Sequence, residues 1–229
     1  MSINENPKFN FEEGEVLLVN KPLEWTSFDI VNKIRFTIKL KKIGHAGTLD
    51  PLATGLLIVC TGKMTKKINE FQDMDKEYTG KMILGKTTPS CDLETEIDSE
   101  KDISGITPES VKETTKKFTG KIMQIPPIFS AIRVGGERLY KKARRGESIK
   151  IAPREVHVTE FEITKITLPE IHFRIVCSKG TYIRSLVRDF GESLGAGAYM
   201  SALQRTRIGN FHIEDAYAVE DIVNLAKKS

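Results

Sequence analysis

The sequence has 229 residues, 39% hydrophobic and 29% charged, with a formal net charge of +4. A chain of this length can bury a full core as one large domain, or as one domain with a small module. Its three cysteines and four histidines are scattered, which argues against a disulfide framework and against a metal site. Residues 1–10 lack a basic start and an apolar core, and no window approaches eighteen apolar residues. We therefore expect no signal peptide and no membrane span, and we predict a cytoplasmic location.

The first predicted elements are a strand over residues 15–20 and a helix that follows almost at once. Thr26 can cap the helix, with Asp29 three residues later in the position of a capping box. Gly44 should end the apolar pattern. The apolar residues that recur at helical spacing are Phe28, Val31, Ile34 and Ile38.

The stretch Gly44–Gly62, GHAGTLDPLATGLLIVCTG, joins a glycine-rich loop to an apolar run over residues 56–60 that predicts a buried strand. Pro51 disfavours a helical conformation at Asp50, so we expect this carboxylate to project from a loop that the strand anchors. An aspartate that only caps a turn is the alternative.

The next segment alternates between short elements and polar connections. Residues 63–71 predict a short helix with lysines on its solvent side, and residues 76–86 predict a strand that carries Tyr78. Residues 87–102 are polar without a clear period, so we expect a surface excursion. Thr107 followed by Pro108 marks the start of another helix, and Gly120 its end.

Residues 124–146, QIPPIFSAIRVGGERLYKKARRG, predict a protruding hairpin and a short helix, because two prolines and a Gly-Gly pair interrupt them. We call Arg133–Glu147 the basic window. It contains six basic and two acidic residues, so the rest of the chain carries equal numbers, 29 of each. Such a concentration of positive charge favours a polyanionic partner, and a solvated basic face is the alternative.

The remaining chain predicts two strands, a helix, a strand and a terminal helix. The two strands cover residues 155–164 and 170–177, with a turn near Pro169. The helix covers residues 182–194, the third strand residues 200–211 and the last helix residues 217–228. No phosphate loop, dinucleotide fingerprint, nucleophile elbow or metal-binding helix is present in the sequence.

Five pieces of the sequence, in order, resemble the tRNA pseudouridine-55 synthases of the TruB family. They are NKPLEWTSFD, GHAGTLDPLATGLL, KEYTGKMILG, PPIFSAIRVGGERLYKKARRGE and CSKGTYIRSLVRDFGESLGAGAYMSALQRTRIGNF. Each piece alone is weak, whereas five in the family's order are specific.

The resemblance implies an α+β fold, in which helices flank a mixed, mainly antiparallel sheet. We expect a tail over residues 1–14, a catalytic domain over 15–213 with an RNA-binding thumb insertion at about 124–152, and a short terminal helix over 214–229. Many family members continue into a small RNA-binding PUA domain, which we do not expect here.

The resemblance also implies a reaction and a set of residues. Uridine 55 in the T-loop of tRNA would be flipped out and isomerised to pseudouridine, which needs neither a metal nor another cofactor. Asp50 matches the catalytic aspartate, which would attack either the base or the sugar. Arg184 matches the catalytic arginine that pairs with it, and Tyr78 matches a catalytic tyrosine that packs on the flipped base and would help remove the C5 proton. The matching substrate-binding residues are His45, Tyr182, Leu203, Arg133, Lys141, Lys142, Arg144 and Arg145.

The expected partner is the T-arm of tRNA, held through phosphates and splayed loop bases by a monomer without an obligate protein partner. DNA and membranes are not expected partners. Two alternatives remain at this point: a catalytic subunit of a guide-RNA-dependent pseudouridylating particle, and a non-catalytic tRNA-binding or folding factor.

Overall fold

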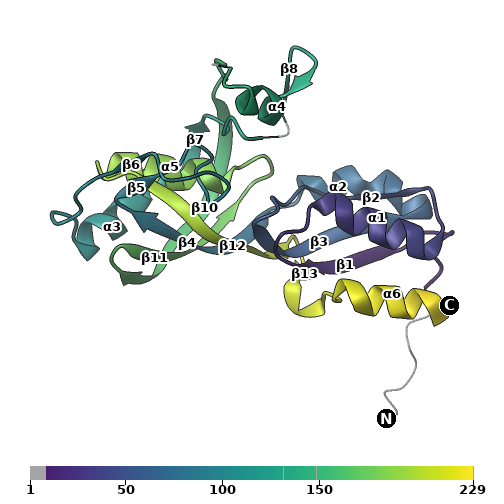
Figure 1. Ribbon diagram of the computed structural model, residues 1–229. Coiled ribbons are helices and arrows are strands. Elements are labelled where there is room, and N and C mark those ends of the chain that lie inside the picture. The colour runs from purple at the N-terminus through teal and green to yellow at the C-terminus, as the bar shows by residue number, and fades with distance from the viewer. Residues whose placement is uncertain (1–8, 131, 148, 229) are drawn as a thin grey trace, which may run out of the picture. The chain divides into compact units, whose positions relative to one another are not determined.

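The computed structural model describes residues 9–130, 132–147 and 149–228 (Figure 1). The chain divides into two compact units. The first contains the residues up to Tyr78 together with those from Gln204 onward, and the second contains Thr79–Leu203. Strands β4 (Lys76–Leu84) and β12 (Ala198–Ile208) each contain a boundary between the units, so each contributes residues to both.

The first unit is built on the antiparallel pair β1 and β3, in register from Val16 opposite Cys60 to Lys21 opposite Gly55. Strand β2 pairs with the last three residues of β3, from Val59 to Thr61, and β13 pairs with β12. Its elements are β1 (Val16–Lys21), α1 (Ser27–Ile38), β2 (Ile43–His45), β3 (Ala53–Thr61), a 3-10 helix (Gly62–Lys67), α2 (Ile68–Asp73), β13 (Phe211–His212), a 3-10 turn (Ile213–Asp215) and α6 (Val219–Lys228).

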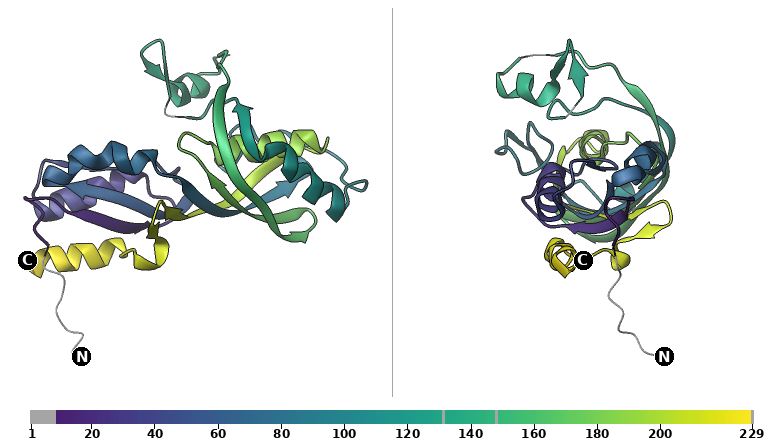
Figure 2. Two further views of the ribbon diagram at one scale, coloured as in Figure 1. Left: turned by 180° about the vertical axis from the view of Figure 1, so that it is seen from behind. Right: turned by 90° about the vertical axis from the view of Figure 1, so that its right-hand side faces the viewer.

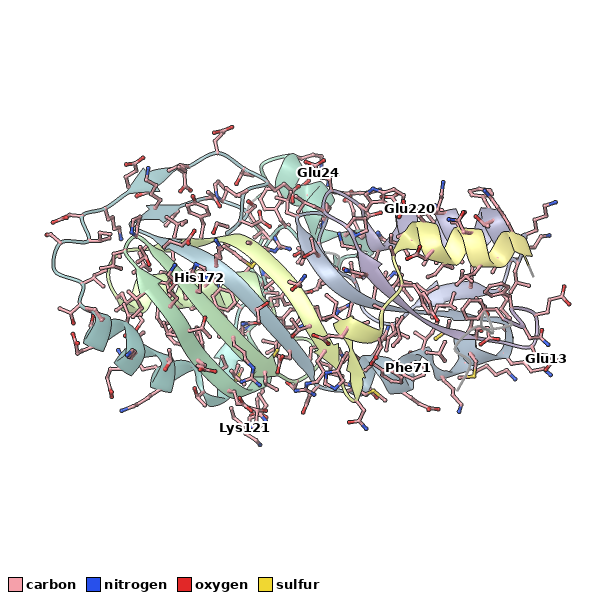
Figure 3. All side chains as sticks on the ribbon, turned by 90° about the horizontal axis from the view of Figure 1, so that it is seen from below. Glu13, Glu24, Phe71, Lys121, His172 and Glu220 are labelled. Carbon is pink, nitrogen blue, oxygen red and sulfur yellow. The ribbon has the colours of Figure 1, made fainter. Side chains whose placement is uncertain are left out.

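Helices cover both faces of this sheet because successive side chains of a strand point to opposite faces. Leu57 and Val59 of β3 pack with Ile30 of α1 and Ile222 of α6. The other face, which includes Ile58, packs against Phe71 of α2, labelled in Figure 3. Residues 56–60 of β3 are therefore buried on both faces of the sheet, as their apolar run predicted.

The second unit contains a sheet in the order β12, β4, β11, β10, β7. Strands β10 and β11 form a long twisted hairpin (Figure 2). Strand β7 pairs antiparallel with β10 at the edge and carries Lys121, labelled in Figure 3. The Nζ of Lys121 lies 3.5 Å from Oε1 of Glu155 in β10. The remaining elements are β5 (Lys86–Thr87), β6 (Ser99–Glu100), α3 (Pro108–Thr115), a 3-10 helix (Lys116–Phe118), β7 (Gly120–Gln124), β8 (Arg133–Val134), β9 (Glu137–Arg138), α4 (Leu139–Arg144), β10 (Arg154–Thr167), β11 (Glu170–Cys177) and α5 (Ile183–Ser193).

Aromatic packing joins α5 to the sheet of the second unit. The ring of Phe161 in β10 lies 6.3 Å from that of Phe173 in β11 and 5.4 Å from that of Phe190 in α5, measured between centroids. All three side chains are buried. Helix α5 is thereby fixed against the strands, and its first turn has a defined position within this unit.

The predicted α+β fold with a mainly antiparallel sheet is confirmed, and so are the two helix starts. Thr26 caps α1 in a capping box with Asp29, and Thr107 caps α3 with Pro108 in its first turn. The prediction for Phe28 is wrong, because this side chain is 57% exposed and Ile30 lies in the core instead.

The surface excursion predicted over residues 87–102 is wrong for its first part. Thr88, Ser90, Cys91 and Asp92 are all buried, whereas residues 93–100 are mostly exposed. Hydroxyl groups make this burial possible, because Thr88 Oγ1 and Ser90 Oγ both donate to the main-chain oxygen of Asp92, at 2.6 and 3.2 Å. A polar sequence can be buried where its groups bond one another.

Candidate active site

Asp50 lies in the loop between β2 and β3, as predicted, and its side chain is half-buried. Its main-chain oxygen accepts a hydrogen bond from Ala53 N at 3.0 Å, which closes a turn around Pro51 at the start of β3. The carboxylate therefore stands on a short turn that begins a fully buried strand.

The start of α1 holds the residues just before Asp50. Ser27 Oγ accepts a hydrogen bond from Leu49 N at 2.9 Å and lies 3.2 Å from Leu49 O, to which it can donate. Glu24 N donates to Pro51 O at 2.9 Å, so both flanks of Asp50 are bonded to the segment that leads into α1. The backbone on each side of the carboxylate is thus fixed within the first unit.

Lys21, the last residue of β1, is fully buried beside this loop. Its ammonium group donates to the main-chain oxygens of Trp25 at 2.6 Å, Pro22 at 2.9 Å and Pro51 at 3.3 Å. Burial lowers the pKa of Lys21 to about 8, and the negative charge of Asp50 acts in the opposite direction. The buried Lys21 cation is therefore attracted to the Asp50 carboxylate and also hydrogen-bonds Pro51, the residue that follows it.

Arg205 of β12 is the second buried cation at the loop, with 1% of its surface exposed. Its Nε donates to Leu56 O at 2.8 Å and its Nη2 donates to Gly47 O at 3.2 Å. A Cβ at Gly55 would lie 2.4 Å from the main-chain oxygen of Arg205, so only glycine fits where the two backbones meet. The sequence assigned no role to either cation; a lysine ending an otherwise apolar strand is the one signal for Lys21.

His45 and Tyr78 belong to the same unit as Asp50. His45 is half-buried on β2, where burial lowers its pKa and the charge of Arg205 lowers it further, so the imidazole is neutral at pH 7. Tyr78 of β4 is buried, with 9% of its surface exposed. A neutral ring and a phenol are both suited to stacking on bases.

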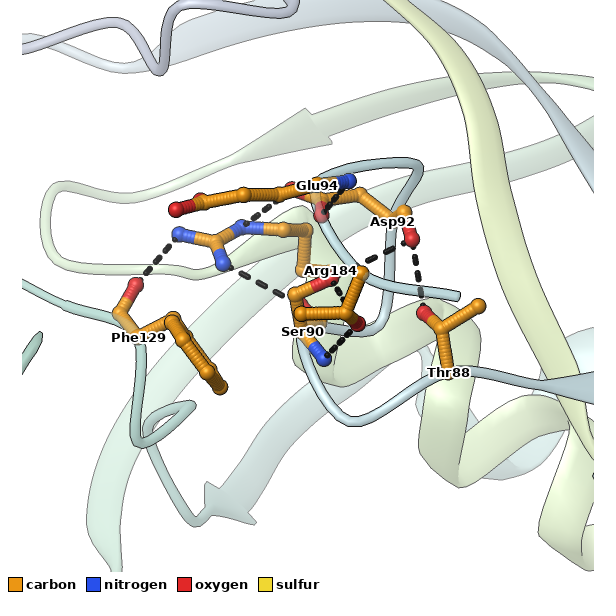
Figure 4. A network of polar contacts seen from close by, with 7 residues as sticks. Thr88, Ser90, Asp92, Glu94, Phe129 and Arg184 are labelled. Carbon is orange, nitrogen blue, oxygen red and sulfur yellow. Dashed lines mark hydrogen bonds and ion pairs between the residues drawn. The ribbon is translucent and has the colours of Figure 1, made fainter. Parts of the chain in front are cut away.

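Arg184, in the first turn of α5, is buried in the second unit with 4% of its surface exposed. Its Nη1 donates to Ser90 O at 3.1 Å and its Nη2 donates to Phe129 O at 2.8 Å (Figure 4). Its Nε lies 3.5 Å from Oδ2 of Asp92. The guanidinium is thus held by two segments that are distant in sequence, one at Ser90, 94 residues earlier, and one at Phe129, 55 residues earlier.

Asp92 is itself fixed, which makes it a rigid partner for Arg184. It is 3% exposed, and its Oδ1 accepts a hydrogen bond from Glu94 N at 3.0 Å while Oδ2 faces the guanidinium. Paired buried charges keep a defined geometry because leaving either one alone is costly. Sequence reasoning missed Asp92, since residues 87–102 show no periodicity that marks burial.

The other two pocket residues named by the resemblance also lie in the second unit. Tyr182 is the N-cap residue of α5 and is half-buried, and Leu203 of β12 is 7% exposed. The first unit thus contains Asp50, His45 and Tyr78, and the second unit contains Arg184, Tyr182 and Leu203.

The basic window forms the β8–β9 hairpin followed by α4, as predicted. Arg145 donates to both carboxylate oxygens of Glu137, at 2.7 and 2.8 Å, and to Glu147 at 2.8 Å. Its charge is thus paired with the two acids of the window, whereas Lys141 is exposed and Lys142 is half-buried. The backbones of Arg133 and Arg144 lie in β8 and α4, and their side chains lie outside those that the structure describes.

Among residues 9–130, 132–147 and 149–228, no group of three or more His, Cys, Asp or Glu side chains could hold a metal ion. In the same part of the chain no helix has the length and apolar character needed to cross a bilayer.

Known proteins resemble this chain over most of its length. Two family models match, the N-terminal domain of TruB family pseudouridylate synthases over residues 35–183 and the tRNA pseudouridylate synthase B C-terminal domain over residues 184–229. Curated relatives named tRNA pseudouridine synthase B include one from Flavobacterium johnsoniae, 56% identical over 89% of this chain and 92% of its own, and one from Phocaeicola vulgatus, 54% identical over 92% of each.

Among solved structures, a chain of a Cbf5-Nop10-Gar1 complex superposes with a TM-score of 0.73 at 31% identity, covering 93% of this chain and 54% of its own. The similarity thus extends from the sequence to the tertiary fold. With both family models matched and relatives more than half identical over nearly their full length, the chain belongs to the TruB family of pseudouridylate synthases.

Proposed function

We propose that this protein isomerises uridine 55 in the T-loop of tRNA to pseudouridine, with Asp50 as the carboxylate that engages the nucleotide. The relatives named tRNA pseudouridine synthase B support the reaction and the tRNA substrate. The observation that carries the assignment to Asp50 is its position on a turn that α1 and two buried cations hold at the start of β3.

The reaction breaks the bond between N1 of uracil and C1′ of ribose, and a new bond forms between C5 and C1′. The proton on C5 leaves and N1 gains one, so the product is an isomer and no electrons enter or leave. A carboxylate can assist by adding to the base or by bonding to C1′ of the sugar. In either case Asp50 must be ionised and fixed while the base turns.

Positive charge supports both requirements. Lys21 stabilises the ionised carboxylate within the first unit and bonds the turn that carries it. Arg184 is the proposed bidentate partner of Asp50 during the reaction, and Asp92 positions its guanidinium. A preorganised charge of this kind costs little reorganisation when the glycosidic bond breaks.

The remaining residues bind the flipped nucleotide and the RNA around it. Tyr78 packs on the uracil, with Tyr182 and Leu203 lining the pocket, and the neutral ring of His45 inserts among the T-loop bases. Flipping costs a few kcal/mol, and stacking on an aromatic ring returns about 1 to 3 kcal/mol per base. The basic window, as a thumb, holds the phosphates of the T-arm.

Of the alternatives, the guide-dependent subunit is less favoured. The chain is 44 to 56% identical to relatives named tRNA pseudouridine synthase B, across about nine-tenths of each, but 27 to 31% identical to chains of the Cbf5 complexes, which are longer. We propose that it acts on tRNA without a protein partner.

The test uses the purified full chain and an unmodified tRNA transcript, with no guide RNA. Pseudouridine is mapped at every uridine, and a transcript with cytidine at position 55 is the matched control. We expect product at position 55 alone with the wild type and none with Asp50→Asn. Absence of product with the wild type would reject the stand-alone enzyme, and equal product with Asp50→Asn would reject the role of Asp50.

A further inference from the structure

The side chain of Gln124 is buried at the end of β7, with 1% of its surface exposed. Its Oε1 accepts a hydrogen bond from Tyr182 N at 2.8 Å, and its Nε2 donates to Tyr182 O at 3.1 Å. One side-chain amide thus pairs with both main-chain groups of a residue 58 positions away, as a neighbouring strand would. A side-chain amide carries a donor and an acceptor side by side in one planar group at any pH, and asparagine, which has the same group, is shorter.

Tyr182 occupies the position where the orientation of α5 is set. It is the N-cap residue, its side chain makes no capping hydrogen bond, and its main-chain oxygen also accepts the first bond of the helix, from Leu186 N at 3.1 Å. The first N–H groups of a helix have no partner within the helix, so contacts from outside determine how the first turn is held. Gln124 supplies such a contact from the sheet.

The segment that follows Gln124 is bonded to the first two turns of α5. Pro126 and Pro127 have no N–H, so this segment cannot continue the strand ladder of β7. Side chains of α5 bind its carbonyl oxygens instead. Ser185 Oγ donates to Ile125 O at 2.8 Å, Arg188 Nη2 donates to Ile125 O at 3.1 Å, and Arg184 Nη2 donates to Phe129 O at 2.8 Å.

From these contacts we infer that Gln124 is a positioning residue for the reaction, which fixes the first turn of α5 and through it the guanidinium of Arg184. This rests on the role of Arg184 under the proposed function. Gln124 needs no contact with the RNA for this role. A small rotation of the first turn would move the long Arg184 side chain away from the geometry that Asp92 and Ser90 define.

The experiment measures two quantities on the full chain, the single-turnover rate of pseudouridine formation at saturating enzyme and the dissociation constant for tRNA. Gln124→Glu keeps the acceptor for Tyr182 N but places an oxygen against Tyr182 O. Gln124→Met has a similar length and removes both bonds. We expect a rate loss of about 10- to 100-fold for each, with tRNA affinity changed less than threefold, because an unmade buried hydrogen bond has an effect of this order.

A double-mutant cycle separates positioning from general loosening of the fold. If Gln124 acts through Arg184, then Gln124→Met should lower the rate less than threefold further in an Arg184→Lys background. Gln72→Glu, at a half-buried position in α2, makes the same chemical change elsewhere and should leave the rate unchanged.

Wild-type rates in both Gln124 variants would overturn the inference, and so would rate losses that multiply fully with the loss in Arg184→Lys. Loss of folded structure in both Gln124 variants, measured by circular dichroism, would also overturn it, because the two hydrogen bonds to Tyr182 would then serve stability. A wild type that forms no pseudouridine would instead reject the proposed function, so the two failures are distinct.

Discussion

Individual residues hold the Asp50 loop by filling positions that tolerate little else. Gly55 adopts a φ of +104° and its backbone lies directly against that of Arg205. Lys21 is fully buried and binds three main-chain oxygens. Both residues are buried, so their substitution tests the support of the site rather than contact with substrate.

Gly55→Ala should destabilise the protein by about 2 kcal/mol or more, because a Cβ would lie 2.4 Å from Arg205 O and the backbone conformation is strained for an L-residue. Gly105→Ala is the control, since a Cβ there meets no atom within 4 Å. Urea unfolding of both variants checks this. Equal free energies of unfolding for Gly55→Ala and Gly105→Ala would contradict the prediction, because the backbones of residues 55 and 205 would then move apart without loss of stability.

Lys21→Met tests the buried cation through pH. The pKa of Lys21 is about 8 in the folded protein, against 10.5 as its ordinary value. Between these values the unfolded chain binds more protons than the folded one, so the wild type should gain stability relative to the variant as pH rises, by up to about 1.4 kcal/mol per pH unit. Below pH 8 both states hold the proton and the difference should be constant.

The measurement for Lys21 is urea unfolding of wild type and variant at pH 7.5 and pH 9.5. Lys66→Met, at an exposed position, controls for the loss of a lysine. A difference between wild type and Lys21→Met that does not change with pH would contradict the lowered pKa.

Among structural elements, the basic window contains both a charge that pairs within the window and charges for which no such ion pair is described. Arg145 connects Glu137 of β9 with Glu147 beyond α4, so it closes the hairpin and helix on themselves. Lys141 and Lys142 of α4 carry no such pairing among the contacts that the structure describes. The residues that the resemblance assigned to RNA binding therefore include one, Arg145, that also holds the hairpin and helix together.

Lys141→Ala combined with Lys142→Ala should weaken tRNA binding and reduce the slope of log K against log salt by about 1.5, since each lost phosphate contact removes about 0.7 to 0.9. A salt titration of tRNA binding measures this. The double variant Lys112→Ala with Lys116→Ala, exposed on and just after α3, removes the same charge elsewhere in the second unit. An unchanged slope in the first variant would exclude phosphate contacts by these lysines.

Arg145→Ala should act differently, because it removes a structural ion pair. We expect weaker tRNA binding with a salt slope close to that of the wild type. A slope reduced as much as in the lysine variant would assign Arg145 to phosphate binding instead.

At the scale of the whole molecule, binding and chemistry should separate. Ligand that binds only the folded state stabilises it by mass action, so tRNA at a hundred times its dissociation constant should add about 2.7 kcal/mol. Asp50→Asn should show the same stabilisation in thermal unfolding, since the carboxylate serves the reaction and the RNA surface holds the tRNA. A variant that tRNA no longer stabilises would place Asp50 among the binding residues.

Features that depend only on neighbouring residues could be predicted from the amino-acid sequence. The capping box at Thr26, the helix start at Thr107, the buried strand after Asp50 and the hairpin of the basic window all follow from local spacing and from proline and glycine positions. The matched motifs added the family and the identity of the candidate catalytic residues, because they preserve residue types in order along the chain.

The burial of polar side chains and the identity of their partners became evident from the folded structure. Lys21, Arg205, Asp92 and Gln124 look like surface residues in the sequence, and each is buried. Most of their partners are main-chain atoms far away, 58 residues for Gln124 and Tyr182, and 158 for Arg205 and Gly47. A main-chain oxygen is the same at every position, so the sequence carries no mark of such a partner until the fold brings the two together.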